Sequence, residues 1–334
     1  MGKSSLKIVL LLGGVSSERE VSKESGKSIY NALISLGYET KIIDPGYGLN
    51  QPENIGDFFA EKDFSEVKKE NVIESVRCEE FENADLVFIG LHGKYGEDGI
   101  IQSLLELKDL KYTGSNVVAS AAAMDKILSK ILFERVSVKT PDWFAVEKNE
   151  IEAEYIVERI AGSVSYPCVI KPNDSGSTIG LTICKSESEV KPALKKAAQF
   201  SNKILIEKFI PGRELTVGIF DERTLPVLEI IPKKGFYDYE AKYGEGKSDY
   251  VVPAEIPEQL AKKMQSDALA AHRALGCSVY SRVDFRLSPE NEYYCLEVNN
   301  LPGMTSHSLV PMMAKAVGVS FNELIDAIVK LSLK

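Results

Sequence analysis

Residues 281–308 read SRVDFRLSPENEYYCLEVNNLPGMTSHS, in which two runs typical of β-strands flank a turn. With the turn at Pro289–Glu292, antiparallel pairing places Asp284 opposite Glu297. Glu297 and Asn299 lie two residues apart, so their side chains share one face of the hairpin. The sequence therefore predicts two carboxylates and an amide oxygen together on one surface.

This group of oxygen atoms has two interpretations. Carboxylate and amide oxygens are ligands that Mg²⁺ prefers, particularly when phosphate groups complete its coordination shell. Alternatively, the oxygens form a solvated face of the hairpin, balanced by Arg282, which the same pairing places opposite Asn299. Their chemistry alone leaves both interpretations open.

The hairpin ends in a segment suited to binding anions. Residues 299–303 read NNLPG, and the polar string Thr305–Ser308 leads into a helix with Pro311 in its first turn. Free backbone amides at the start of a helix hold carboxylates and oxyanions well. Simple N-capping of this helix by a serine is the alternative.

A second candidate site lies earlier in the chain. Lys171 ends an apolar strand, and the loop Asn173–Gly180 that follows consists mostly of small residues whose backbone amides are suited to binding phosphates. It differs from a P-loop, because the lysine precedes the glycines and a strand follows them instead of a helix. Taken alone, this loop favours a plain β-hairpin.

The first ninety residues predict a parallel sheet. Apolar runs of strand length occupy Lys7–Leu12, Glu39–Ile43 and Asp85–Leu91. Between the first two, a capping box at Ser17 and Glu20 marks the start of a helix. Strands that alternate with helices are typical of a parallel sheet with helices on its faces. The turn after the first strand lacks the G-x-G-x-x-G pattern, which disfavours a dinucleotide-binding sheet.

The remaining chain suggests a division into domains. A long helix is expected over 116–135, and short strands and helices follow it. The helical pattern stops at Thr140-Pro141, where we place a first domain boundary. A polar, aromatic loop is expected at 233–249. The length of 334 residues agrees with two or three domains of about 150 residues or fewer.

Composition and charge exclude several classes of protein. With 44% hydrophobic and 27% charged residues, the chain is typical of a globular protein and not of a disordered one. A net charge of -9 provides no positive field to attract nucleic acid or an anionic membrane. The longest apolar run is far shorter than the ~18 residues of a membrane span, and acidic residues follow it where a signal peptide would be cleaved. We therefore expect a cytoplasmic protein.

Histidines and cysteines give no sign of a zinc site or of covalent chemistry. None of the three histidines pairs with another His or Cys at the spacing of metal ligands. His92 follows a strand and is a candidate functional residue, whereas His272 lies in a predicted helix. The five cysteines are an odd number and lie mostly in apolar runs, so we expect free, buried thiols. The expected chemistry is based on phosphate and metal ions.

Taken together, these motifs resemble the D-alanine:D-alanine ligases of the ATP-grasp superfamily, and the resemblance covers essentially the whole chain. The matching segments are Gly13–Ser22, Leu91–Gly93, Gly96–Gly99, Tyr112–Ser115, Met124–Lys126, Lys171–Pro172, Gly176–Ser177, Glu207–Lys208, Pro211–Glu214, Tyr237–Tyr243 and Pro302–Ser308. The occurrence of so many segments in the family's order makes coincidence implausible. The resemblance implies an N-terminal parallel-sheet (pre-ATP-grasp) domain followed by a two-lobed ATP-grasp fold of α/β and α+β class. It implies an N-terminal α/β substrate-binding domain at 1–114, a central α+β lobe at 115–214 and a C-terminal lobe, which contains the loop 233–249, at 215–334.

The resemblance also implies that ATP, the co-substrate, lies between the two lobes. Lys126 and Lys171 would contact its phosphates, because a lysine ammonium acts as a compact point charge. Glu214 would accept hydrogen bonds from the ribose. The other residues assigned to ATP are Ser175, Gly176 and Ser177 in the covering loop, Glu207, Lys208, Phe209 and Ile210 in the strand beside adenine, and Lys242.

Asp284, Glu297 and Asn299 match the family's ligands for two Mg²⁺ ions, for which Mn²⁺ can substitute. In such a site the metal bridges the phosphates and neutralises charge during phosphoryl transfer. The implied reaction moves the γ-phosphoryl of ATP to the carboxylate of one D-alanine. The amine of a second D-alanine then attacks this acyl phosphate, and the products are ADP, phosphate and D-alanyl-D-alanine for peptidoglycan synthesis.

The resemblance assigns roles to residues around the substrates. Glu18 and His92 would bind the ammonium of the first D-alanine. Arg282 and the amide of Gly303 would stabilise the oxyanion of the tetrahedral intermediate. Ser308 would bind the carboxylate of the second D-alanine.

A lid over this site is also implied. Ser177 and Tyr243 would join Glu18 in a hydrogen-bonded triad that closes the loop 233–249, and Lys242 in the same loop would add positive charge near the phosphoryl group. Tyrosine at position 243 favours D-alanine as the second substrate. The resemblance further implies a homodimer, with D-alanine and ATP as its small-molecule partners and no nucleic acid or membrane partner.

The sequence departs from the family at two places. Asn173-Asp174 stands where many relatives have Arg-Glu, and Asn300 stands where threonine is usual. The alternatives are a ligase of D-alanine with D-lactate or D-serine, a non-catalytic ATP-binding regulator, and a nicotinamide-dependent oxidoreductase. The retained lysines and carboxylates argue against the regulator, and the missing glycine pattern argues against the oxidoreductase.

Overall fold

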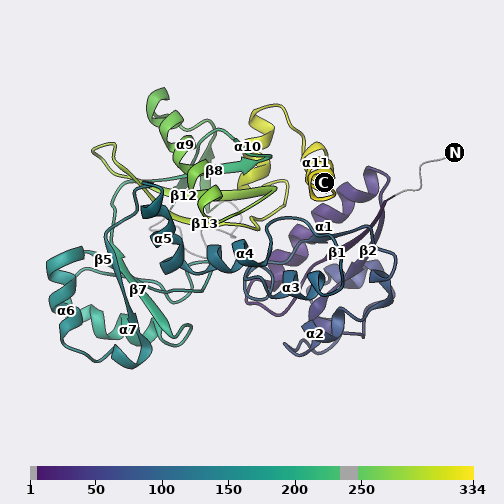
Figure 1. The fold of residues 1–334 in the computed structure, drawn as a ribbon, viewed down its shortest axis with the longest axis horizontal. Helices are drawn as coiled ribbons and strands as arrows, with labels where there is room; N and C mark the ends of the chain where they lie inside the picture. Colours follow the sequence, from purple (N-terminus) through teal and green to yellow (C-terminus); the bar gives the residue numbers. More distant parts are fainter. Residues whose placement is uncertain (1–5, 234–246) are drawn as a thin grey trace.

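The computed structural model describes residues 6–233 and 247–334, which form three β-sheets with their helices (Figure 1). The first sheet is parallel and the other two are antiparallel. This arrangement confirms the predicted combination of an α/β part with α+β parts. Within the described ranges, no helix combines the length and the apolar character needed to cross a membrane.

The first sheet has the strand order β2-β1-β3, with β1 (Lys7–Leu11) between β2 (Glu39–Ile43) and β3 (Leu86–Ile89). α1 (Arg19–Ser35) connects β1 to β2, and Gly37 adopts a φ of 84° just after the helix ends. All three predicted strands and this helix are confirmed, but the predicted capping box is wrong: Glu18 is the N-cap instead of Ser17, and its side chain makes no capping bond. The other helices of this region are η1 (Pro45–Tyr47), η2 (Ile55–Phe59), α2 (Asn71–Ser75), η3 (Glu79–Phe81) and α3 (Ile100–Glu106).

The prediction of a single helix over 116–135 is wrong, because the helix is interrupted at Asp125. α4 (Val117–Met124) ends there, and α5 (Lys126–Arg135) begins at the next residue. The backbone of Asp125 is extended, and its carboxylate accepts a hydrogen bond from the Leu128 amide at 2.9 Å. Asp125 therefore caps α5 and places Lys126 at the first position of that helix.

The second sheet, in the order β4-β7-β5-β6, carries α6 and α7 on one face (Figure 1). Its strands are β4 (Trp143–Glu147), β5 (Cys168–Pro172), β6 (Thr182–Cys184) and β7 (Lys203–Lys208). Its helical segments are η4 (Lys148–Glu150), α6 (Tyr155–Arg159), η5 (Ile160–Val164), η6 (Glu187–Glu189) and α7 (Val190–Ala197). The expected short strands and helices are present, and single turns of 3-10 or π geometry adjoin α6 and α7.

The third sheet has the path β11-β10-β8-β12-β13, and β9 pairs with β8. Its strands are β8 (Arg213–Phe220), β9 (Arg223–Thr224), β10 (Leu228–Pro232), β11 (Ser248–Val251), β12 (Tyr280–Leu287) and β13 (Tyr293–Asn299). α9 (Glu258–Ala274) packs on this sheet, α10 (Leu309–Ala316) contacts β8, and α11 (Phe321–Ser332) returns to pack against α1 (Figure 1). The sequence analysis did not predict β9 or β11.

The hairpin β12–β13 has the predicted pairing at the site but a different turn. Asp284 lies opposite Glu297, as expected, and the same register places Arg282 opposite Asn299. The turn is one residue shorter, because the Ser288 amide bonds to the carbonyl of Glu292 at 2.8 Å. A register shift between Asp284 and its neighbour in β12 then compensates for the shorter turn.

Packing crosses the predicted domain boundaries in two places. Phe133 of α5 shares a hydrophobic core with Val283 and Phe285 of β12. Leu324 of α11 shares a core with Leu33 of α1. The division into 1–114, 115–214 and 215–334 remains a prediction.

All five cysteines are buried and free, as expected.

Candidate active site

A cleft of about 580 Å³, partly open to solvent, lies where the second sheet faces the third. It collects side chains from α5, β5, β8, β12, β13 and the loop between β5 and β6. The lining residues are Lys126, Lys171, Pro172, Ser175, Gly176, Ser177, Thr178, Ile179, Leu181, Glu214, Asp284, Leu296 and Glu297. The structure thus brings the residues predicted for the ATP phosphates together with both carboxylates predicted for the metal.

Lys126 connects three parts of this cleft. Its ammonium donates to the carbonyl of Ser175 at 2.9 Å and lies 3.5 Å from a carboxylate oxygen of Glu297. Its backbone amide donates to the carbonyl of Asn173, whose side-chain oxygen accepts from the Ile127 amide at 2.8 Å. The unusual Asn173 therefore joins the covering loop to the start of α5.

Lys171 belongs to a buried ionic cluster. Its ammonium lies 2.6 Å from one oxygen of Glu207, and the ammonium of Lys130 lies 2.7 Å from the other. Burial disfavours the ionised form of Glu207, but the two lysines outweigh it and lower the pKa of this carboxyl to about 2. Burial lowers the pKa of Lys130, and Glu207 opposes that shift.

The sequence analysis missed Lys130, although a signal was available. Lys130 lies four residues after Lys126 and therefore on the same side of α5. The sequence analysis also placed Glu207 beside adenine and did not recognise that both carboxylate oxygens of Glu207 pair with lysines.

Two of the three predicted metal ligands, Asp284 and Glu297, pair with cationic side chains in this structure. Both oxygens of Asp284 accept from Arg282 at 2.8 Å, and one also accepts from Thr216 at 2.7 Å. The side-chain oxygen of Asn299 accepts from the Leu301 amide at 3.0 Å. Among the described residues, no group of three or more His, Cys, Asp or Glu side chains is arranged to hold a metal.

The donor set nevertheless fits Mg²⁺ in the presence of a nucleotide. Asp284 and Glu297 are paired across the hairpin, and both line the cleft beside Lys126 and Lys171. Two hard carboxylates next to a phosphate-sized space match the preference of Mg²⁺ for a few protein oxygens completed by phosphates and water. The solvated-face alternative does not describe Asp284, which is only 8% exposed.

Glu18 and Ser177 join the first glycine turn to the loop over the cleft. The Ser177 hydroxyl donates to a carboxylate oxygen of Glu18 at 2.5 Å, across 159 residues of sequence. Glu18 is 5% exposed. The third member of the predicted triad, Tyr243, lies outside the described residues, as does Lys242.

A buried ionic cluster that the sequence analysis did not identify fixes the first glycine turn. The Gly14 amide donates to Asp44 at 2.9 Å, and the Gly14 carbonyl accepts from Arg19 at 2.5 Å. Arg19 also pairs with Asp44 at 2.7 Å and with Asp63 at 2.9 Å. Glu18 is thus held directly beside a rigid anchor, Arg19.

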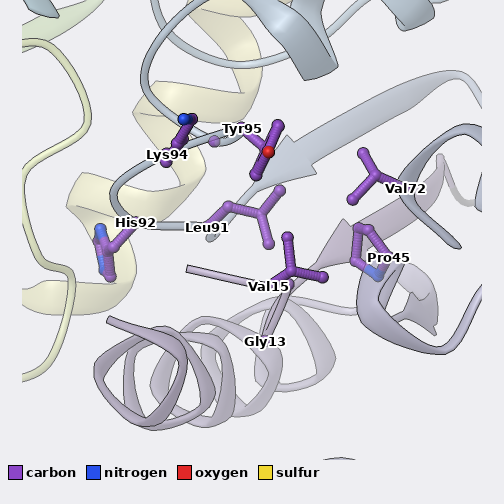
Figure 2. A pocket seen from close by; sticks show the side chains of 10 residues that line it. Gly13, Val15, Pro45, Val72, Leu91, His92, Lys94 and Tyr95 are labelled. Atoms are coloured by element: carbon purple, nitrogen blue, oxygen red, sulfur yellow. The ribbon is translucent and has the colours of Figure 1, made fainter. Parts of the chain in front are cut away.

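The His92 ring connects α1 to the segment after β13. One ring nitrogen lies 2.9 Å from the Ser25 hydroxyl, and the other lies 3.2 Å from the carbonyl of Leu301. The Met304 amide donates to the same Ser25 hydroxyl at 3.3 Å. Figure 2 shows that His92 and Leu91 point in different directions, with Leu91 extending toward the neighbouring apolar side chains.

The small space in Figure 2 has an empty volume of about 220 Å³. Its lining residues are Gly13, Gly14, Val15, Pro45, Val72, Leu91, His92, Lys94, Tyr95 and Gly96. This space lies against the side of the first glycine turn and next to the predicted substrate residue His92.

Gly303 and Ser308 lie close together at the start of α10. A Cβ atom added to Gly303 would lie 3.1 Å from the Ser308 hydroxyl. Ser308 occupies the N-cap position without a capping side-chain bond, and its hydroxyl instead accepts from the Thr305 amide at 2.9 Å. The simple N-capping alternative is therefore wrong for this side chain.

Glu214 lines the cleft, and the residues predicted to lie beside adenine are at the end of β7 and just after it. Glu214 lies 3.2 Å from Arg286, which also donates to the carbonyl of Ile210. Glu207 and Lys208 end β7, and Phe209 follows them. The Asn300 side chain donates to Glu97 and Ser120, so this departure from the family supports local structure.

Comparisons with known proteins agree with this geometry. The family model described as D-ala D-ala ligase N-terminus matches residues 7–115, and the one described as D-ala D-ala ligase C-terminus matches residues 132–330. The D-alanine–D-alanine ligase of Halalkalibacterium halodurans is 42% identical and covers 98% of this chain and 100% of its own. The D-alanine–D-alanine ligase of Syntrophotalea carbinolica is 41% identical, and the match covers 96% of this chain and 94% of that protein.

Solved structures are similar over the whole chain. The crystal structure of D-alanine–D-alanine ligase from Bacillus anthracis complexed with ATP has a TM-score of 0.79 and 32% identity, with 98% of both chains covered. The VanG D-Ala:D-Ser ligase from Enterococcus faecalis has a TM-score of 0.80 and 28% identity, with 98% and 100% covered. The predicted two-lobed fold after a parallel-sheet domain is confirmed.

Proposed function

Because the chain belongs to the D-alanine–D-alanine ligase family, we propose that its cleft joins two molecules of D-alanine with the consumption of ATP. The γ-phosphoryl group moves to the carboxylate of the first D-alanine and forms an acyl phosphate. The amine of the second D-alanine attacks this carbonyl, phosphate leaves, and D-alanyl-D-alanine and ADP remain. The observation that carries the proposal is the convergence of Lys126, Lys171, Asp284 and Glu297 on one cleft.

The nucleotide lies against the second sheet in this proposal. Lys126 and Lys171 bind its phosphates, and residues 175–177 cover them from the loop between β5 and β6. Glu214 receives the ribose hydroxyls, and adenine lies beside the end of β7 from Glu207 to Ile210. The ionic cluster of Lys171 supports this placement, because only a cation facing the cleft can exchange its partner for a phosphate.

Asp284, Glu297 and Asn299 would hold two Mg²⁺ ions or Mn²⁺ in their place. A bound divalent cation neutralises negative charge on the transferring phosphoryl group. The pairing of Asp284 with Glu297 supports this assignment. Arg282 would then be released from Asp284 to face the tetrahedral intermediate, where its permanent charge stabilises the oxyanion together with the Gly303 amide.

The substrates occupy the space between the first glycine turn and the start of α10. Glu18 and His92 bind the ammonium of the first D-alanine, and Ser308 binds the carboxylate of the second. The contacts that run from His92 through Ser25 to Met304 support this arrangement, because they join His92 to the segment that follows Gly303. Tyr243 and Lys242 complete the lid in this proposal.

We also propose three properties of the whole protein. It divides into domains at 1–114, 115–214 and 215–334, acts as a homodimer and works in the cytoplasm. Five free, buried thiols agree with a reducing compartment.

The test is steady-state release of ADP in the presence of Mg²⁺ and ATP, with products identified by mass. D-alanine, L-alanine and D-alanine with D-lactate or D-serine are compared as substrates. We expect turnover that depends on D-alanine and yields D-alanyl-D-alanine even with the other acceptors present. ATP binding without turnover on any of these substrates would contradict the proposal and favour a regulator.

A further inference from the structure

Lys130 is the most deeply buried charged residue near the cleft that the mechanism above does not use. Its side chain is 0% exposed, and it does not line the cleft. Its ammonium lies 2.7 Å from Glu207 and donates to the Thr140 hydroxyl at 2.6 Å. Thr140 in turn donates to the carbonyl of Cys295 at 2.8 Å, which fixes the amine between α5 and β13.

Glu207 stands between this amine and the cleft. Its second oxygen pairs with Lys171, which lines the cleft where the phosphates are expected. The cluster therefore contains two cations around one carboxylate, and only one of these cations faces the nucleotide. A carboxylate that is 2% exposed has almost no access to water as a replacement partner.

This arrangement has a consequence for nucleotide binding. When a phosphate oxygen binds Lys171, it competes with Glu207 for the ammonium. A buried carboxylate that loses its only cation carries a large desolvation penalty and takes up a proton instead. A second cation that stays in place removes most of this penalty.

We propose that Lys130 is a positioning residue for ATP, which acts as the fixed counter-ion of Glu207 and so allows Lys171 to turn toward a phosphate. The inference rests on the proposed function, because it requires ATP in the cleft. It assigns no contact between Lys130 and substrate.

The charges around Glu207 agree with this role. Lys130 faces it from α5 and Lys171 faces it from β5. From β13, Glu297 favours the charged form of Lys171, and Cys295 favours the charged form of Lys130. Of these neighbours, Lys130 is the cation that the nucleotide does not reach.

Calorimetric titration of ATP with Mg²⁺, without D-alanine, tests the proposal in two buffers of different ionisation enthalpy. We expect Lys130→Met to weaken ATP binding by about tenfold or more and to increase proton uptake on binding relative to the wild type. The double variant Lys130→Met/Glu207→Gln should lose the extra proton uptake, because a neutral amide needs no counter-ion and takes up no proton. The control Lys195→Met removes an exposed lysine of α7 that pairs with Glu152, and should bind ATP like the wild type.

Two results would overturn the inference: wild-type affinity in Lys130→Met, or a double variant that keeps the extra proton uptake of Lys130→Met. Failure of the wild type to bind ATP would instead contradict the proposed function. Thermal unfolding without nucleotide checks that each variant is folded. If Lys130→Met does not fold, Thr140→Val replaces it, since it removes only the hydroxyl that fixes the amine. Weaker ATP binding by Thr140→Val supports the inference, and unchanged binding contradicts it.

Discussion

The first glycine turn and the loop between β5 and β6 both follow a buried strand, yet they are held in different ways. The turn at 13–18 is fixed by the fold around it, through bonds from Asp44 and Arg19 to Gly14. The loop at 173–180 is mostly half-exposed, and two of its contacts go to residues of the site itself. Ser175 accepts from the Lys126 ammonium, and Ser177 donates to Glu18.

Each loop is also backed by a buried ionic cluster, and the two clusters differ in the same sense. Asp44 is surrounded by Arg19 and the amides of Gly14 and Gly46, all of which belong to the fold of the first domain. Glu207 is paired with Lys171, which faces the cleft. From this comparison we infer that the proposed substrate end of the site is formed in advance, and we expect the proposed nucleotide end to rearrange when ATP binds.

The largest expected effect is on the first cluster. Asp44→Asn leaves the buried guanidinium of Arg19 with half-exposed Asp63 as its remaining carboxylate, and we expect a loss of about 4 kcal/mol in the free energy of unfolding. Urea unfolding measures this. The control Glu152→Gln breaks an exposed ion pair and should cost less than about 1 kcal/mol. Equal effects of the two substitutions would show that the turn has no rigid anchor.

A somewhat smaller effect is expected from acid on the second cluster. Burial opposes ionisation of Glu207, but Lys130 and Lys171 lower its pKa from 4.5 to about 2. A lowered pKa stabilises the fold above the unfolded value, so this contribution of roughly 3 kcal/mol is lost as the pH falls from about 4.5 to about 2. Glu207→Gln should therefore reduce the slope of stability against pH in this range, measured by urea unfolding. An unchanged slope would contradict the ionised cluster.

The smallest expected effect on stability concerns the hydrogen bond between the two loops, from Ser177 to Glu18. Ser177→Ala removes a hydrogen bond to a charged carboxylate, and we expect kcat/KM to fall roughly 10- to 100-fold. The free energy of unfolding should change by less than about 0.5 kcal/mol, because Ser177 is half-buried in the covering loop. Ser163→Ala, an exposed serine that bonds to the carbonyl of Arg159, is the matched control. A loss of stability without a loss of activity would mean that the contact is structural only.

Local sequence patterns predicted the strands of the first sheet and the pairing of Asp284 with Glu297. The pairing was correct although the turn was one residue too long, because a shift inside the hairpin compensated for it. The shift leaves Leu296 of β13 without a partner in β12, and it has no local signal in the sequence. The break at Asp125 had a recognisable signal, since aspartate is a good N-cap, but an alanine-rich run on one side obscured it.

Helical spacing could have placed Lys130 beside Lys126, but the charged partners within the two ionic clusters could not be predicted from the sequence, for a different reason. Arg19 meets Asp44 and Asp63 only after β2 and the following segment fold around it. Lys130 meets Glu207 across 77 residues of sequence. Charged residues in helices are normally exposed, so burial of these two side chains follows from tertiary structure and not from local pattern.

Hydrogen exchange of backbone amides, with and without ATP and Mg²⁺, tests the central comparison most directly. We predict that ATP slows exchange strongly in residues 173–180 and leaves residues 13–18 nearly unchanged, because that turn is already fixed by Asp44 and Arg19. Equal protection of both loops by ATP, or exchange in the turn that is fast without ATP and slow with it, would contradict a substrate end that is formed in advance.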